Sequence, residues 1–331
     1  MTRRAWIAFA ACSVLWGIPY FFIKVAVADL PAVFVAWGRI ALAAAILLPI
    51  AWHRGALRGV WERRWLIVAF GLMEVAIPFT LIPIGERHIS SSLTAILIAS
   101  LPLTVAFLAI RFAPEERAHG IRLAGLIVGL FGVVLLLGID VAGKTDELLG
   151  SLCVLGATLG YAAGPMLANK TLSDLPPIAP VTGALAVSTV ALLPLAVLSP
   201  PGGGVPFKAW GSVVVLGTAC TAVALVVFFV LLTEAGPSRA SVITYINPVV
   251  AVGLGVAFLD ESLGAASVAG LVLILAGSYV STRAGDRQPA LVGEDHRLHA
   301  VPGSELREDS LDVGLDGRLL DDERGGDLRV R

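Results

Sequence analysis

The chain alternates between apolar runs of about 20 residues and short polar segments, and ten such runs follow one another. A helix needs about 20 apolar residues to cross a hydrocarbon core of about 30 Å. Within that core the backbone N–H and C=O groups must pair inside the segment itself, so each run is predicted to be a helix. The ten predicted spans cover residues 5–25, 31–51, 65–84, 89–111, 119–138, 148–167, 178–198, 209–232, 238–259 and 263–282.

Part of this pattern occurs twice. Residues 89–132 and residues 238–277 each contain an apolar run, an acidic turn and a second, glycine-spaced apolar run. The aligned positions include Ser92 with Ser238, Pro102 with Pro248, and Glu115-Glu116 with Asp260-Glu261.

The two aligned apolar runs are the fourth and the ninth predicted spans. Because they are five spans apart, an odd number, they are expected to cross the membrane in opposite directions. The predicted fold class is therefore an all-α integral membrane protein with ten transmembrane helices, arranged as two inverted five-helix repeats. The repeats are assigned to residues 1–138 and 139–282, and inverted repeats are typical of secondary transporters. A duplication kept for packing alone, as in a membrane scaffold or a channel, is the alternative.

Composition agrees with a membrane protein and separates off the C-terminus. Hydrophobic residues make up 57% of the chain, charged residues 15%, and the mean hydropathy is +0.86, outside the range of ordinary soluble domains. Twelve of the 25 acidic residues lie after residue 282, where no aromatic residue occurs. Residues 283–331 are therefore predicted to be a disordered cytoplasmic tail, with a regulatory or partner-binding role as the alternative.

Basic residues in the short loops predict the orientation, because cytoplasmic loops carry an excess of Lys and Arg. With the N-terminus inside, eleven basic residues lie on the cytoplasmic side, before the tail, and only Arg87, Lys144 and Lys208 lie in external loops. The protein is thus predicted to be a multi-pass protein of the cytoplasmic membrane with both termini in the cytoplasm. The eleven are Arg3, Arg4, Arg54, Arg58, Arg63, Arg64, Arg111, Arg117, Arg122, Lys170 and Arg239.

Several short motifs, in their order and repetition, carry a family resemblance. They include Leu15-Trp16-Gly17 and Arg39 in the first half, and Gly236-Pro237-Ser238 and Leu259-Asp260-Glu261 in the second. Over residues 5–282 the chain resembles the EamA-type transporters of the drug/metabolite transporter superfamily. The resemblance implies export or import of a small metabolite, amino acid-like or drug-like, through a cavity between the repeats. Efflux is the direction that we expect.

Two charged residues in the spans are candidates for function. Glu74 is placed at the centre of the third span, where a charge costs about 2.5–3.5 kcal/mol, so it should face the bundle interior and could carry a proton or bind a cationic group. A protonated glutamate bonded to a carbonyl is the alternative. Arg39 lies at a similar depth in the second span, so an Arg39–Glu74 pair is expected to be within reach; a purely structural Arg39 is the alternative. Lys24, at the outer end of the first span, is expected to snorkel to the headgroups, or else to contact an outer gate.

The remaining candidates are aromatic or polar residues within or near the spans. Because Pro248 lacks an N–H and so frees a carbonyl, polar groups near it favour a binding site. Packing is the alternative for every aromatic residue. The candidates for the cavity lining are Trp16, Tyr20, Ser100, Tyr161, Asn169, Tyr245 and Asn247.

The sequence gives less support to other classes of membrane protein than to a transporter. A membrane enzyme acting on lipid-linked substrates would cluster charges at one face, and a channel would show rings of like charge. The three cysteines show no metal or disulfide spacing, and no P-loop is found, so neither a metal nor another cofactor is expected. The expected partners are lipids, a small-molecule substrate and protons, without nucleic acid. The glycine-spaced runs predict close helix contact and could also support a homodimer.

Overall fold

The computed structural model describes residues 1–112, 119–140 and 144–283. Within these ranges all regular structure is helical, so the predicted all-α class is confirmed. The predicted tail and the acidic turn Glu115-Glu116 lie outside the described residues.

A helix lies within each of the ten predicted spans. Nine helical segments of the described chain are long and apolar enough to cross a membrane, and the ninth predicted span contains the shorter apolar helix Ile243–Phe258. The first-half helices are α1 (Arg3–Gly17), α2 (Pro19–Val27), α3 (Ala32–His53), α4 (Arg64–Gly71), η1 (Leu72–Ala76), α5 (Ile77–Glu86), α6 (Ser91–Ile98), α7 (Leu101–Phe112) and α8 (Ile121–Asp140). The second-half helices are α9 (Thr145–Thr171), α10 (Ile178–Leu198), α11 (Phe207–Gly217), η3 (Thr218–Val223), α12 (Ala224–Ala235), α13 (Pro237–Ala240), α14 (Ile243–Phe258) and α15 (Ala265–Arg283).

Two spans contain a π-helical turn, η1 in the third and η3 in the eighth. In η1 the N–H of Ile77 bonds to the carbonyl of Leu72, and in η3 the hydroxyl of Thr221 bonds to the carbonyl of Leu216 at 2.8 Å. A π-turn inserts an extra residue into a helix and therefore changes the direction of every side chain beyond it. The offset that aligns Ser92 with Ser238 also aligns the first residues of η1 and η3.

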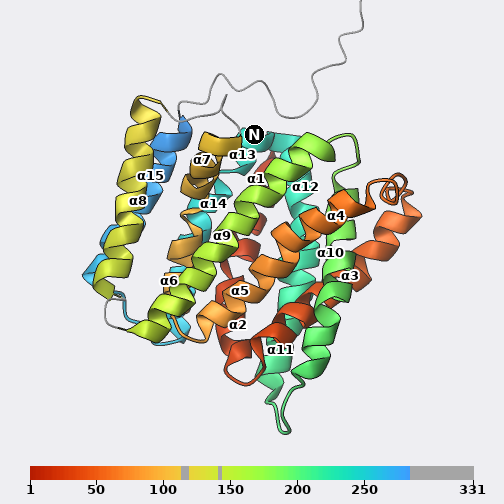
Figure 1. Cartoon of the computed structure of the whole chain (residues 1–331), viewed down its shortest axis with the longest axis horizontal. Coiled ribbons are helices and arrows are strands. Elements are labelled where there is room, and N and C mark those ends of the chain that lie inside the picture. Colours follow the sequence, from red (N-terminus) through yellow and green to blue (C-terminus); the bar gives the residue numbers. More distant parts are fainter. Residues whose placement is uncertain (113–118, 141–143, 284–331) are drawn as a thin grey trace, which may run out of the picture. The chain divides into compact units, whose positions relative to one another are not determined.

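The helices of the two halves pack against one another in a repeated pattern. Helix α3 packs on α10, α4 and η1 pack on α10, and α11 and η3 pack on α3. Likewise α5 packs on α9, α12 packs on α1, and α6 packs on α14. Figure 1 shows α3 and α10 on the side of the bundle away from α8 and α15.

The last spans of the two halves, α8 and α15, lie side by side (Figure 1). Their glycines allow this contact, because a Cβ on Gly125 would lie 2.9 Å from the carbonyl oxygen of Gly277. A Cβ on Gly132 would lie 3.1 Å from that of Gly270. The prediction of close helix contact is confirmed, and the contact lies within the chain.

Candidate functional site

A buried arginine lies where the two halves meet. Helix α3 places Arg39 against η3, and its side chain is among the buried charged groups, with 5% of the residue exposed. Its Nη2 donates to the hydroxyl of Thr221 at 3.1 Å, and its Cζ lies 4.1 Å from the centre of the Phe79 ring. The Nε of Arg39 has no hydrogen-bond partner among the described residues. A buried charged donor left unpaired is costly, so this group is suited to receive an anionic ligand.

Aromatic side chains from three helices lie near the guanidinium. Phe79 of α5 and Tyr161 of α9 pack edge to face with ring centres 6.4 Å apart. Tyr20 of α2 and Tyr161 both interact electrostatically with Arg39, as does Glu86. Arg39 forms no ion pair with any carboxylate of the described chain. The positive charge is therefore held by a hydroxyl and by rings, which attract a cation only weakly.

Glu74 and Arg39 do not form an ion pair with each other. Glu74 belongs to η1, and its Oε2 is buried without a hydrogen-bond partner in residues 1–112, 119–140 and 144–283. It packs against Gly164 of α9, where a Cβ would lie 2.5 Å from that oxygen. Depth along the span made the pair plausible, but depth does not fix rotation about the helix axis. Glu74 is turned toward α9, whereas Arg39 is turned toward Phe79 and Thr221.

A second buried carboxylate, Glu86, was not among the predicted residues. It ends α5, its exposed fraction is 0%, and in the part of the chain that the structure describes neither Oε1 nor Oε2 has a hydrogen-bond partner. The predicted third span stopped at residue 84, which placed Glu86 in a loop. The hydropathy of the sequence does not reveal that Glu86 is buried. Its position between Gly85 and the external Arg87 did, however, indicate that a span ends there.

The ammonium of Lys24 is bound by backbone carbonyls of the protein instead of extending freely to the headgroups. Its Nζ donates to the backbone carbonyls of Glu86, at 2.6 Å, and Ile89, at 2.7 Å. The snorkelling prediction is therefore wrong. The reason is that helix α5 ends beside α2, and its last carbonyls offer acceptors that the lysine can reach.

The other candidates do not converge on Arg39. Trp16 stacks on Phe228 with ring centres 4.7 Å apart, and the hydroxyl of Ser100 bonds to the carbonyl of Leu97. Asn169 is exposed near the end of α9. Tyr245 shares a hydrogen bond with Thr282 at 2.9 Å, and the Asn247 amide, with its nitrogen turned toward them, can donate to the carbonyls of Ser13 and Ile243. Of the predicted lining residues, Tyr20 and Tyr161 join Arg39.

A solved structure has a related fold. A crystal structure superposes with a TM-score of 0.61 over 86% of this chain and 99% of its own, at 18% sequence identity. At that identity the likeness concerns the fold alone.

Comparisons of the sequence with known proteins also find similar membrane proteins. An uncharacterized transporter of Archaeoglobus fulgidus is 27% identical over 85% of this chain and 99% of its own length. The uncharacterized inner membrane transporter YedA of Escherichia coli is 23% identical over 82% of this chain and 91% of its own. The family model for EamA-like transporters matches residues 4–138 and again residues 148–283. The chain is a multi-pass membrane protein that belongs to the EamA-like transporter family.

Proposed function

We propose that the protein is a secondary transporter that exports a small organic metabolite across the cytoplasmic membrane by alternating access. The observation that carries this proposal is Arg39, a buried cation that donates a hydrogen bond from the first half to Thr221 of the second. Within the described part of the chain its Nε has no partner. A charge in that position has a substantial cost. A solute that supplies an anionic group would offset the cost, and its release would restore it.

The repeated packing supports two halves of opposite orientation, residues 1–138 and 139–282. Helix α3 meets η3 of the other half, and α10 meets η1 in the same way. Rocking of one such half against the other moves access to a central site from one face to the other. The π-turns lie at aligned positions and interrupt the α-helical hydrogen bonds there, so they are suited to act as the bending points of this motion.

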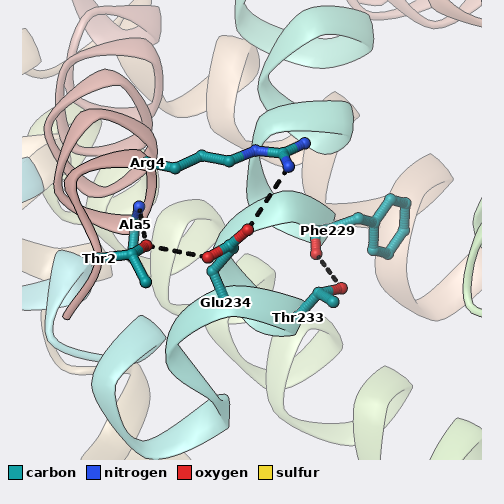
Figure 2. A network of polar contacts seen from close by, with 6 residues as sticks. All are labelled: Thr2, Arg4, Ala5, Phe229, Thr233 and Glu234. Atoms are coloured by element: carbon teal, nitrogen blue, oxygen red, sulfur yellow. Dashed lines mark hydrogen bonds and ion pairs between the residues drawn. The ribbon is translucent and has the colours of Figure 1, made fainter.

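Contacts between loops support an even number of crossings with both termini in the cytoplasm. Arg63 pairs with Asp174 at 2.7 Å, joining two loops that are both predicted to be cytoplasmic. Figure 2 shows Glu234, at the end of α12, held by Arg4 and Thr2 of the N-terminus, again on the predicted cytoplasmic side. On the opposite side, Glu261 accepts hydrogen bonds from the N–H groups of Ser91 and Ser92. The segment that contains Glu261 and the segment that contains the two serines are both predicted to reach the external side.

Coupling to protons, or exchange, would drive the export. Glu74 supports proton coupling, because its Oε2 is buried in the π-turn η1 without a partner in the described chain.

The test is flux in proteoliposomes that contain the purified full chain. Labelled amino acids and drugs that carry an anionic group are supplied with and without an imposed pH gradient, and Arg39→Ala is the matched inactive variant. We expect saturable flux of at least one solute that Arg39→Ala abolishes. Flux equal to that of protein-free liposomes for every solute, under both conditions, would contradict the proposal.

A further inference from the structure

The segment between α3 and α4 collects positive charge at the edge of the bundle (Figure 1). Residues 54–64 contain four arginines and one acidic residue, Glu62, which leaves a net charge of +3. The loop that follows α10 in the second half, residues 199–206, contains no charged residue. An excess of basic residues is ordinary in a cytoplasmic loop. What distinguishes this segment is the way in which its side chains are held.

The backbone of the segment is folded onto the bundle. Gly55 and Gly59 have positive φ angles of 64° and 82°, a conformation that glycine adopts without strain. Ala56, next to the first of these glycines, is buried. Val60, next to the second, packs against the hydrophobic cluster that contains Ile67. The segment therefore has an apolar side fixed to the bundle and an opposite side that faces outward.

One of the four arginines anchors the segment, and three remain for a partner. Arg63 pairs with Asp174 at 2.7 Å and also donates to the backbone carbonyl of Thr171. The other three arginines are exposed and form no ion pair with a carboxylate of the described chain. These exposed residues are Arg54, Arg58 and Arg64.

Three indole rings lie in the same stretch. Trp52, Trp61 and Trp65 are 75%, 78% and 73% exposed. The Cζ of Arg64 lies 5.5 Å from the ring centre of Trp61 and 5.9 Å from that of Trp65. A guanidinium beside an aromatic ring keeps its donors free for another ligand. Tryptophan, with an apolar ring and one N–H donor, is enriched where a membrane meets water.

We propose that these exposed arginines and tryptophans, the Arg–Trp face, bind the headgroup of an anionic phospholipid. Guanidinium groups match the geometry of phosphate oxygens, and the indoles fit the boundary between headgroups and acyl chains. Basic clusters directly beside a membrane span attract anionic lipids. A soluble phosphate would use the arginines alone and would leave the three indoles in water.

A lipid bound at this face would act on the two helices that the segment joins. Helix α3 carries Arg39, and α4 continues into the π-turn η1. A ligand that binds the folded protein and not the unfolded chain raises the unfolding temperature. Binding to the Arg–Trp face should therefore stabilise the protein whether or not a transported solute is present. The proposal goes beyond transport and is tested without measuring flux.

The experiment follows thermal unfolding of the purified full chain in an uncharged detergent. Phosphatidylglycerol is titrated in, and phosphatidylcholine with the same acyl chains is the comparison. We expect a saturable rise in melting temperature with phosphatidylglycerol alone, and a smaller rise at high salt. Equal shifts with the two lipids would overturn the proposal. A shift of the same size with inorganic phosphate, or with a polyglutamate peptide, would also overturn it, because the ligand would then not be a lipid.

Variants then test whether the Arg–Trp face is the site. The triple variant Arg54→Gln, Arg58→Gln, Arg64→Gln should weaken the apparent affinity for phosphatidylglycerol at least about tenfold. Lysine at the same three positions keeps the charge and should retain most of the affinity, which separates loss of charge from loss of fold.

A charge-matched control removes three exposed arginines from other parts of the chain. This control changes Arg3, Arg87 and Arg239 to glutamine and should bind phosphatidylglycerol as the wild type does. Equal affinity in the glutamine triple variant of the Arg–Trp face and in this control would overturn the assignment of the site.

Discussion

The two π-turns, η1 and η3, have the same kind of backbone turn but carry different side chains. Both follow a glycine that allows close approach to the other half. A Cβ on Gly71 would lie 3.0 Å from the backbone of Ala184, and one on Gly217 would lie 2.9 Å from the carbonyl oxygen of Arg39. The first turn carries Glu74, whose buried oxygen has no partner, and the second carries Thr221, which binds Arg39.

This difference shows that the same backbone turn, present in both halves, can support two different functions through its side chains. At the aligned positions, Glu74 stands opposite Cys220 and Val75 stands opposite Thr221. The first turn therefore has a group that can exchange a proton, and the second has a group that holds the central arginine. In the proposed mechanism both turns bend, but only the first responds to protons and only the second to the solute. Exchanging their side chains one at a time separates these tasks.

The largest effect is expected from Glu74→Gln. The amide keeps the shape of the side chain but cannot take up and release a proton, so flux should lose its dependence on the pH gradient while the protein still folds. Flux is measured in proteoliposomes at several imposed gradients. Cys220→Ser, at the aligned position of the second turn, is the control and should keep the wild-type dependence. Unchanged pH dependence in Glu74→Gln would remove Glu74 as the proton carrier.

Gly164→Ala is expected to disturb the first turn by packing. The added methyl group would lie 2.5 Å from Oε2 and 3.0 Å from Cβ of Glu74. Overpacking of this kind costs about 1–3 kcal/mol of folding free energy. Thermal unfolding in detergent measures the loss. Gly253→Ala in α14, where a Cβ meets nothing within 4 Å, is the matched control and should leave the melting temperature unchanged or slightly raised. Equal melting temperatures for the two variants would contradict the packing of Glu74 on α9.

Thr221→Val removes the acceptor of the Arg39 hydrogen bond from the second turn. The hydrogen bond is charge-assisted and contributes about 1.5 kcal/mol or more, so its loss should raise the KM of the transported solute about tenfold. The change arises because the guanidinium is no longer held in place. Val75→Thr, the reciprocal exchange in the first turn, should leave KM unchanged. An identical KM for Thr221→Val and the wild type would show that Thr221 does not position Arg39.

The smallest effect is expected at the end of the helix that follows the second turn. The Arg4 side chain is 73% exposed, and its pair with Glu234 spans 3.6 Å. Exposed pairs contribute about 0–1 kcal/mol and are screened by salt. Arg4→Ala should therefore lower the melting temperature less than Gly164→Ala does, and raising the salt concentration should reduce the difference further. A loss larger than that of Gly164→Ala would mean that the N-terminus clamps α12 far more strongly than its exposure suggests.

The hydropathy pattern was sufficient to predict the helices but not their interruptions. Ten apolar runs predicted ten helical segments, because length and apolarity are what a membrane span requires. The π-turns cannot be recognised in that pattern, because one extra residue in a span of about 20 changes its length and its hydropathy too little. The acidic turn Asp260-Glu261 was recognised by repetition alone, and its binding to the N–H groups of Ser91 and Ser92 needed the fold.

The site was predicted in part for a similar reason. Arg39, Tyr20 and Tyr161 were recognised because polar and aromatic residues at that depth are costly or conspicuous. Their meeting depends on helix rotation, which the sequence does not specify, so the Arg39–Glu74 pair was wrong. Glu86 was missed because the predicted span ended two residues before it, while α5 extends to it and buries it.

The central claim is that the two halves face the membrane in opposite directions. The direct measurement is labelling of single cysteines at Arg58 and Gly203, which lie in the loops after the second and seventh spans, in a chain whose native Cys12, Cys153 and Cys220 are replaced. A membrane-impermeant maleimide should label Gly203→Cys in intact cells and label Arg58→Cys only after permeabilisation. Labelling of both positions from the same side would contradict the inverted arrangement, and with it the proposed alternating access.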